Sequence, residues 1–296
     1  MTELKRATSI SELEEIFANF RTPEGEALGL AYQPAPTDIF VVTPAKCGTT
    51  WMQQIVHGLR TRGSMDFDEI TQVVPWLEMA KDINIDIYQP QVANPRAFKT
   101  HQVLDNVPKG GKYITVVRDP QDAMLSLYRF YEGWVMEKGS ISVKDFALDF
   151  YKKGRRRYWQ HVIAMWNRRN DSDVLALCYE NMIENLPATV ERVADFMEIK
   201  LDHELKDIVL RQSDIKFMRE HNHKFDDHIV RDMRNAVCGI PRDGTTSKVK
   251  NGKVGESKTG VPDDVKAEFD SIWNEEITAK IGLRSYDDLR RELKVM

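Results

Sequence analysis

Cysteine, surplus positive charge and long apolar runs are all scarce in this sequence of 296 residues. The three cysteines, Cys47, Cys178 and Cys238, stand far apart and without metal-ligand spacing, which indicates free thiols in a reducing compartment. The 46 acidic residues exceed the 42 basic ones, so no global positive field attracts nucleic acid or an anionic membrane. No apolar run approaches the roughly 18 to 20 residues that span a bilayer. We therefore expect a cytoplasmic protein whose basic sites are local.

Short apolar runs predict four buried strands, at residues 38–42, 96–100, 112–117 and 173–179. Apolar residues at helical spacing lie between and after these runs, at residues 51–59, 123–134, 159–166, 190–197 and 265–273. Strands that alternate with helices favour an α/β fold with a mainly parallel central sheet flanked by helices. A hydrophobic content of 42% over this length indicates one large domain, residues 1–296. Residues 221–262 lose the periodicity and gain Gly, Lys and Asp, so we expect a long loop or lid there.

Basic or titratable side chains follow each expected strand. They are Lys46 after the first strand, Lys99 and His101 at the second, Arg118 after the third, and Tyr179 with Glu180 at the fourth. Ligands of open α/β sheets bind outside the carboxyl ends of the strands, where the first turns of the following helices offer unpaired N–H groups to anions. The sequence therefore predicts an anion-binding site at this edge of the sheet.

The stretch TPAKCGTT, residues 43–50, joins the first expected strand to a helix and has the composition of a P-loop-like phosphate cradle. Gly48 lets the backbone approach a phosphate, Thr49 and Thr50 add N–H and hydroxyl donors, and Lys46 adds a charge. It is not a Walker A loop, because the lysine precedes the glycine instead of following it. The alternative is an ordinary strand-to-helix turn capped by threonine.

The stretch VVRDPQDAMLSLY, residues 116–128, repeats this arrangement. An arginine at the turn, Arg118, and a hydroxyl two helical turns later, Ser126, can hold a second phosphate. The alternative is a simple turn capped by Asp119. Together, the two units indicate a ligand with two separated phosphates. Between them, Lys99 and His101 face the same side of one strand and supply a cation and a titratable base.

These motifs resemble those of cytosolic-type sulfotransferases, which use 3′-phosphoadenosine 5′-phosphosulfate (PAPS). The similarity rests on KCGTTW at 46–51, KTH at 99–101 and the VVRDPQDAMLSLY stretch, and it runs in order from about residue 36 to 275. It implies transfer of a sulfuryl group from PAPS to a hydroxyl or amine of a small organic acceptor, with release of adenosine 3′,5′-bisphosphate (PAP). No metal is implied.

The resemblance also implies roles for individual residues in binding PAPS. The implied ligands of the 5′-phosphosulfate are Lys46, Gly48, Thr49, Thr50 and the backbone of Cys47. The adenine is implied to contact Trp51 and Tyr179, and the strip from Ser213 to Met218 adds further nucleotide contacts. The implied ligands of the 3′-phosphate are Arg118 and Ser126, with Lys250, Asn251 and Gly252 closing over it.

The implied chemistry is carried by four side chains. His101 would take the proton of the acceptor as general base. Lys46 and Lys99 would stabilise the charge that grows on the bridging oxygen and on the sulfuryl oxygens. Ser126 would hold Lys46 away from the bridging oxygen until an acceptor is bound.

Several positions depart from the pattern of the family. Cys47 replaces a serine and adds an oxidisable thiol near the cofactor. Lys250 and Asn251 replace an arginine and a lysine, which removes a bidentate fork and one charge over the 3′-phosphate. The dimer motif Lys-x-x-x-Thr-Val-x-x-x-Glu would begin at Lys258, and we do not predict that dimer because its last three fixed positions are Pro262, Asp263 and Ala267.

The acceptor is not readable from the sequence. Apolar candidates for its pocket are Phe67, Trp76, Tyr131, Trp134 and Phe146. The basic run from Lys152 to Arg157 is either a solvated helix face or a surface that favours anionic acceptors.

Two other functions stay open at this point. One is PAPS-dependent elimination, in which a sulfated alcohol loses its sulfate. The other is a non-catalytic nucleotide-binding module, which the weakened closure at Lys250 to Gly252 favours. The histidines His221, His223 and His228 do not have the spacing of a zinc module, so we expect no metal site there.

Overall fold

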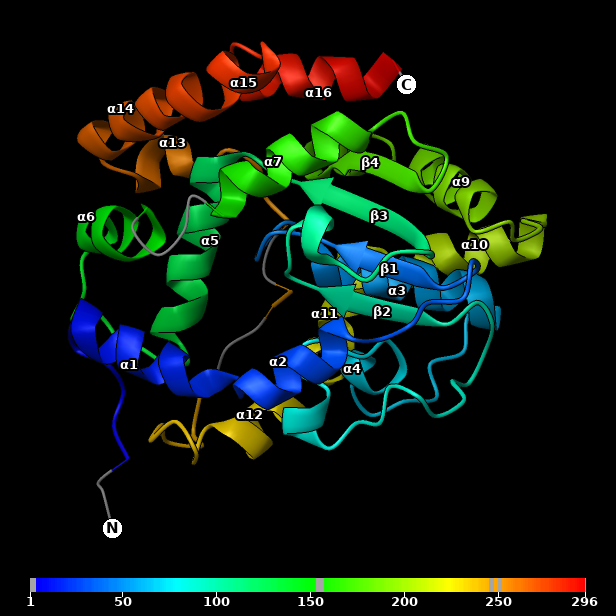
Figure 1. Cartoon of the computed structure of the whole chain (residues 1–296), viewed down its shortest axis with the longest axis horizontal. Helices are drawn as coiled ribbons and strands as arrows, with labels where there is room; N and C mark the ends of the chain where they lie inside the picture. The colour runs from blue at the N-terminus through cyan, green and yellow to red at the C-terminus, as the bar shows by residue number, and fades with distance from the viewer. Residues whose placement is uncertain (1–3, 153–156, 245–247, 250–251, 296) are drawn as a thin grey trace.

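The centre of the protein is a sheet of four parallel strands in the order β2-β1-β3-β4 (Figure 1). The computed structural model describes residues 4–152, 157–244, 248–249 and 252–295. The strands are β1 (Ile39–Val42), β2 (Ala97–Thr100), β3 (Lys112–Val117) and β4 (Val174–Cys178). The four expected strands and their parallel arrangement are therefore confirmed.

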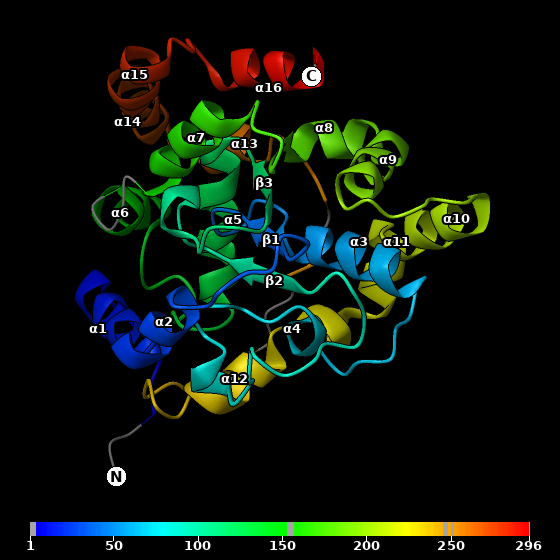
Figure 2. The same ribbon diagram turned by 45° about the vertical axis from the view of Figure 1, so that its right-hand side comes forward.

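Both faces of the sheet are covered, which explains why the strands are continuous apolar runs. On one face, Ile39 and Val41 of β1 pack in a cluster with α3 (Thr49–Thr61), α9 (Leu186–Phe196) and α10 (His203–Gln212). On the other face, Phe40 and Val42 pack in a separate cluster that includes a residue of α7 (Arg157–Arg168). Figure 2 shows α3, α9 and α10 on one side of the strands and α7 on the other. This alternation is the two-residue period of a strand.

The helical patterns of the sequence correspond to α3, α7 and α9, already placed, and to α5 (Pro120–Glu132) and α14 (Asp263–Ile272). The remaining helices are α1 (Ile10–Phe20), α2 (Pro23–Leu30), α4 (Ile70–Val73), α6 (Val143–Asp145), α8 (Tyr179–Glu184), α11 (Ile215–Glu220), α12 (His228–Arg234), α13 (Ser257–Gly260), α15 (Ala279–Ile281) and α16 (Tyr286–Val295). Short 3₁₀ or π-helical turns are η1 (Lys81–Ile83), η2 (Leu104–Asn106), η3 (Phe146–Lys152), η4 (Asn222–Phe225) and η5 (Trp273–Thr278). Within the described ranges, no helix has the length and apolar character that crossing a bilayer requires.

The strand order places a crevice between β1 and β3. The connection from β1 passes through α3 and leads outward to β2, whereas the connection from β3 passes through α5 and α7 and leads outward to β4. Because the two connections diverge, the carboxyl ends of β1 and β3 leave an opening between them, the usual ligand position in open α/β sheets. The turn after β1 contains Lys46, and the turn after β3 contains Arg118.

The expectation of a long loop at residues 221–262 is wrong in part, since η4, α12 and α13 lie within it. The helix α12 is held by its last residue, Arg234, whose guanidinium donates to the carbonyl oxygens of Asn19 and Phe20 at 2.8 and 3.0 Å. Its seven residues make only two turns, too few for a periodic apolar pattern to stand out.

Candidate active site

The turn from β1 to α3 has the backbone geometry of an anion cradle. Lys46 and Gly48 both adopt the left-handed region, with φ of 66° and 92°. Gly48 is the N-cap of α3 and has no side-chain cap, so the N–H groups at the start of this 13-residue helix are open to an anion. A Cβ on Gly48 would lie 2.9 Å from the ring of Tyr179. Glycine is therefore required here for its φ and for the space.

We expect Gly48→Ala to abolish PAP binding, because the added methyl group strains the backbone and displaces Tyr179 from the cavity. Calorimetric titration with PAP measures this. The matched control is Gly139→Ala, since Gly139 also has a positive φ of 77° but nothing within 4 Å of the added Cβ. Gly139→Ala should lower stability by about 1 kcal/mol and leave PAP binding intact. Undiminished binding by Gly48→Ala would contradict the cradle.

The side chains around the cradle divide into two groups. Thr49 and Thr50 line the cavity, and the Thr49 hydroxyl lies 2.5 Å from the hydroxyl of Thr43. Cys47 is fully buried and points into the core beside α5 and α7, where burial raises the pKa of its thiol. The expectation that the Cys47 thiol is readily oxidised is therefore wrong, because the thiol is buried and protonated. Cys47 can offer only its backbone to this site.

One end of the cavity is an aromatic and polar slot formed by Trp51, Tyr179, Ser213 and Met218. The rings of Trp51 and Tyr179 meet edge to face, with centroids 5.6 Å apart. Trp51 Nε1 donates to the carbonyl oxygen of Ser213 at 2.8 Å, which fixes the indole. The buried hydroxyl of Ser213 has no hydrogen-bond partner among the described residues. Such a group is expected to bond a ligand, and a nucleobase between aromatic rings fits the slot.

The turn after β3 holds a buried arginine. Arg118 lies over the ring of Tyr179 at 4.7 Å, and its Nη2 donates to the carbonyl oxygen of Lys253 at 3.1 Å. Its Nε is buried without a partner in the described part of the chain. Ser126 lines the same cavity from α5, as expected from the sequence. An arginine with an unpaired donor beside a hydroxyl fits a phosphate.

The turn after β3 is also capped, as the alternative interpretation of this stretch predicted. The carboxylate of Asp119 accepts the N–H groups of Gln121 and Asp122 at 3.0 and 2.9 Å, and burial raises the pKa of Asp119 to about 6. Glu180 accepts the N–H of Asp119 at 3.1 Å and the hydroxyl of Tyr286 at 2.5 Å. Glu180 is thus a positioning residue for the turn.

The segment around Gly252 is tied to the same helix. Asp122 accepts the N–H groups of Gly255 and Ser257 at 2.6 and 2.8 Å. Gly252 lines the cavity and adopts a φ of 60°, and the carbonyl oxygen of the following residue, Lys253, accepts from Arg118. The expected closing residues Lys250 and Asn251 lie outside the described residues.

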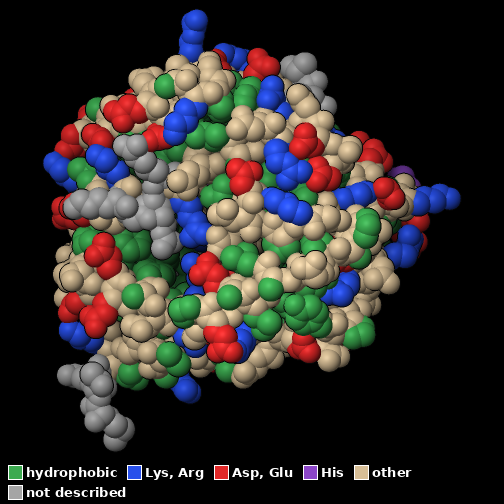
Figure 3. Space-filling view, in the orientation of Figure 1, with side chains coloured by type: hydrophobic (Ala, Val, Ile, Leu, Met, Phe, Trp, Pro, Cys, Tyr) green, Lys and Arg blue, Asp and Glu red, His purple; other side chains and the backbone are tan. Residues whose placement is uncertain are grey.

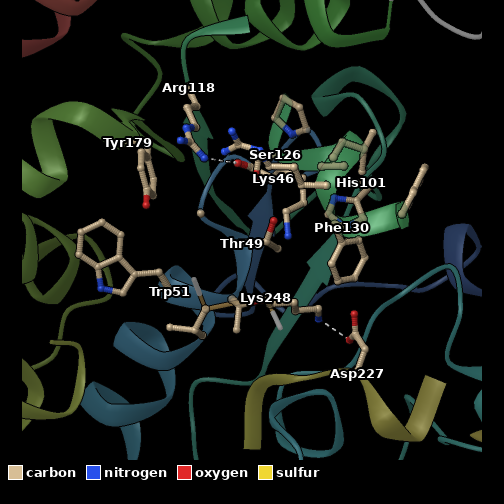
Figure 4. A pocket seen from close by; sticks show the side chains of 18 of the residues that line it. Lys46, Thr49, Trp51, His101, Arg118, Ser126, Phe130, Tyr179, Asp227 and Lys248 are labelled. Carbon is tan, nitrogen blue, oxygen red and sulfur yellow. Dashed lines mark hydrogen bonds and ion pairs between the residues drawn. The ribbon is translucent and has the colours of Figure 1, made fainter. Parts of the chain in front are cut away.

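His101 lies near Lys46 in the cavity (Figure 4). Lys99 lines the same cavity. His101 Nδ1 lies 2.9 Å from the carbonyl oxygen of Thr43. Because a carbonyl oxygen only accepts, Nδ1 carries the proton and Nε2 keeps its lone pair. Burial, aided by the charge of Lys99, lowers the pKa of His101 to about 3, so the imidazole is neutral at physiological pH. The backbone N–H of His101 donates to buried Glu78 at 2.9 Å, which fixes its position.

These two lysines have different surroundings. Lys99 is buried, lies 4.8 Å over the ring of Trp76, and burial lowers its pKa to about 8. Lys46 Nζ lies 4.1 Å over the ring of Phe130, one helical turn after Ser126 on α5. Two ammonium groups and one neutral imidazole therefore converge on one region, which suits the stabilisation of growing negative charge beside a proton acceptor.

Beyond His101, the cavity opens into an aromatic compartment, and the whole cavity has a volume of about 870 Å³. Trp76, Tyr131 and Trp134 line it as expected. Phe67 and Phe146 do not line the cavity: Phe67 packs against His57 in the opposite core, and Phe146 is fully buried behind Tyr131. The sequence did not point to the walls provided by Phe17 and Phe20 of α1, by Phe130 and by Phe150.

Part of the basic run reaches the aromatic compartment. Arg157 lines the cavity and donates to Gln102 Oε1, whereas Lys152 pairs with Glu268. Lys153, Arg155 and Arg156 lie outside the described residues. Figure 3 shows basic and acidic side chains interspersed over one face of the molecule, with lysine and arginine visible at a hollow in that face.

The parallel sheet, the open helix N-terminus at its switch point and the aromatic slot together suit the binding of a nucleotide. The family model that matches, described as a sulfotransferase domain, covers residues 36–281. The chain therefore belongs to the sulfotransferase family, as the motifs indicated, and is a sulfotransferase. This family uses PAPS as the sulfuryl donor and forms PAP.

Relatives of known activity are similar over most of their length. A 3-alpha-hydroxysteroid sulfotransferase of Cavia porcellus is 27% identical over 257 residues, which cover 81% of this chain and 83% of the relative. An amine sulfotransferase of Oryctolagus cuniculus is 26% identical over 254 residues, which cover 81% of this chain and 80% of the relative.

Solved structures share the fold. Retinol dehydratase in complex with androsterone and the inactive cofactor PAP superimposes with a TM-score of 0.67 at 20% identity, covering 93% of this chain and 88% of that chain. A mouse sulfotransferase complexed with PAP superimposes with a TM-score of 0.66 at 19% identity, covering 93% and 94%. The expected α/β architecture is thereby confirmed.

Proposed function

We propose that the protein transfers a sulfuryl group from PAPS to a hydroxyl or amine of a small organic acceptor in the cytoplasm, with His101 as general base. The observation that supports this best is the position of His101. His101 lines the same cavity as Lys46 and packs edge to face against Trp76. Its Nδ1 is bonded to the carbonyl oxygen of Thr43, so Nε2 is the nitrogen that remains to accept a proton. An acceptor in the aromatic compartment would present its hydroxyl or amine to the imidazole.

Each residue of the site has a distinct role in the proposed reaction. His101 Nε2 takes the acceptor proton while the acceptor oxygen or nitrogen bonds to sulfur. Lys46 donates to the bridging oxygen as its bond to sulfur breaks, and Lys99 donates to a sulfuryl oxygen. Ser126 and Arg118 hold the 3′-phosphate, and Trp51 and Tyr179 hold the adenine. The steric requirement at Gly48 supports this placement, as do the Ser213 hydroxyl and the Arg118 Nε, which have no partner among the described residues.

The test is calorimetric titration with PAP of the unaltered protein and of Arg118→Ala. We expect the unaltered protein to bind PAP and Arg118→Ala to lose at least about 3 kcal/mol of binding free energy, because a buried phosphate contact is lost and Asp122 is left without its arginine. A screen of phenols, alcohols and amines with PAPS, read by product mass, then identifies acceptors. Failure of the unaltered protein to bind PAP would contradict the proposal.

Elimination is the second candidate, because the fold superimposes on a retinol dehydratase. An alcohol acceptor distinguishes the two reactions. Transfer adds the mass of a sulfuryl group to the acceptor, whereas elimination removes the mass of water and releases free sulfate. Product mass alone therefore decides between them.

A further inference from the structure

A buried cluster that the proposed mechanism does not use lies against Lys99. Asp227, just before α12, has its carboxylate 3.6 Å from Lys99 Nζ and forms a second ion pair with Lys248. The side chains are 7%, 2% and 11% exposed for Asp227, Lys99 and Lys248. Figure 4 shows Lys248 extending toward Asp227 near His101 and Lys46. All these residues line one cavity.

The charges in this cluster do not balance. Burial disfavours ionisation of Asp227, but the charges of Lys248 and Lys99 outweigh it and hold the pKa of Asp227 below its usual range. Glu69, at the N-cap of α4, also faces the cluster, but burial raises its pKa and one of its oxygens has no partner among the described residues. His101 is neutral. Asp227 is thus the carboxylate that forms ion pairs with both Lys99 and Lys248, and the charge of Lys46 also reaches it.

Two buried ammonium groups that share one carboxylate are under-compensated, because each buried charge requires its own partner to offset desolvation. A sulfuryl group in transfer carries negative charge on its non-bridging oxygens and would lie between Lys46, Lys99 and His101. It would supply the missing charge.

We propose that Lys248 is a third cation of the sulfuryl-transfer site, donating to a sulfuryl oxygen, and that Asp227 is a positioning residue that holds Lys99 and Lys248 side by side. This rests on the proposed function, since it requires PAPS to bind with its sulfuryl group at Lys99. Lys248 donates directly to the group in transfer, whereas Asp227 acts through the two lysines.

The difference between PAPS and PAP tests the role of Lys248 without a known acceptor, because PAP lacks the sulfuryl group. We expect Lys248→Met to weaken PAPS binding by about tenfold and PAP binding by less than about twofold, by calorimetry. Lys248→Arg, which keeps the charge, should recover most of the PAPS affinity and provides a second variant if Lys248→Met folds poorly. Lys258→Met is the matched control, since Lys258 is exposed and outside the cavity.

The outcomes separate the two proposals. Equal effects of Lys248→Met on PAPS and PAP, or none on either, would overturn the role of Lys248 while leaving the nucleotide site intact. Absence of PAP binding by the unaltered protein would instead overturn the proposed function.

The role of Asp227 is tested by the pH dependence of PAPS affinity between pH 6 and 9. Lys99 is protonated below its pKa of about 8, so PAPS affinity should fall as the pH rises through that value. Burial and the charge of Lys248 lower the pKa of Lys99, whereas Asp227 and, to a smaller extent, Glu69 raise it. In Asp227→Asn the decline should therefore begin at least about one pH unit lower.

The control for Asp227→Asn is the same substitution at the adjacent residue, Asp226. Asp226→Asn removes the same charge one position away, but Asp226 pairs with His228 and Arg231 instead of the lysines. Its pH profile should match that of the unaltered protein, and Asp227→Glu should restore the profile lost in Asp227→Asn. An unshifted profile in Asp227→Asn, or the same shift in both asparagine variants, would overturn the positioning role.

Discussion

Replacing His101 with alanine is expected to lower kcat for sulfuryl transfer by about 10²- to 10⁴-fold, while the PAP dissociation constant changes by only a few-fold. The reason is geometric. Thr43 accepts the Nδ1 proton at 2.9 Å, so Nε2 is the nitrogen of this cavity-lining histidine that can accept a proton. The low pKa of about 3 keeps this nitrogen unprotonated, and the negative charge of a bound phosphosulfate would raise its basicity toward neutrality.

The control for His101→Ala is His57→Gln. Burial also lowers the pKa of His57 to about 3. His57 lies on α3, however, and its side chain packs against Phe67, which does not line the cavity. His57→Gln should therefore retain kcat, which separates a catalytic histidine from one that is merely buried. If His101→Ala transferred sulfuryl groups within fivefold of the unaltered rate, its role as general base would be wrong. Steady-state kinetics with an acceptor found by the screen provides the measurement.

Replacing Lys46 is expected to lower kcat by about 10²- to 10³-fold, the usual cost of losing one donor to a developing charge. We expect this for Lys46→Gly and for Lys46→Met alike. The two variants differ in stability, because Lys46 holds a φ of 66° that costs a side-chain-bearing residue about 1 kcal/mol and costs glycine little. Lys46→Gly should thus keep its free energy of unfolding within about 1 kcal/mol of the unaltered protein.

A large loss of activity without a loss of stability in Lys46→Gly would show that the strained backbone at Lys46 is retained for catalysis and not for folding. Urea unfolding and steady-state kinetics on the same preparations measure both quantities. PAP binding should persist in both variants, because the backbone cradle around Gly48 does not depend on the lysine side chain. A large loss of stability in Lys46→Gly, or nearly full activity in either variant, would contradict this account.

The strands were predictable because parallel strands with both faces covered need uninterrupted apolar runs, and β1 shows this with all four residues buried. Helix α12 was missed because two turns contain too little pattern. The inward-facing Cys47 was misjudged for a different reason. Its position in the turn is local, but the direction of its side chain depends on how α5 and α7 pack behind it.

The acceptor compartment shows the same limit. All five aromatic candidates were expected on the same ground, but only Trp76, Tyr131 and Trp134 line the cavity. Phe67 and Phe146 face the two cores. The wall from α1 was not foreseen because about 110 to 130 residues separate Phe17 from its partners Tyr131 and Phe150 in the chain. Only packing brings them together.

What the sequence alone determined are the contiguous units: the turn from Lys46 to Trp51, the stretch from Arg118 to Ser126, and the family to which the chain belongs. Each unit is local, since a strand end and the next helix start fix the chemistry within a few residues. The tertiary structure decided the protonation of His101, through Thr43, and the joining of Lys99, Asp227 and Lys248 from three distant segments. No spacing encodes such contacts, because they form only when the segments before and after α12 pack against the end of β2.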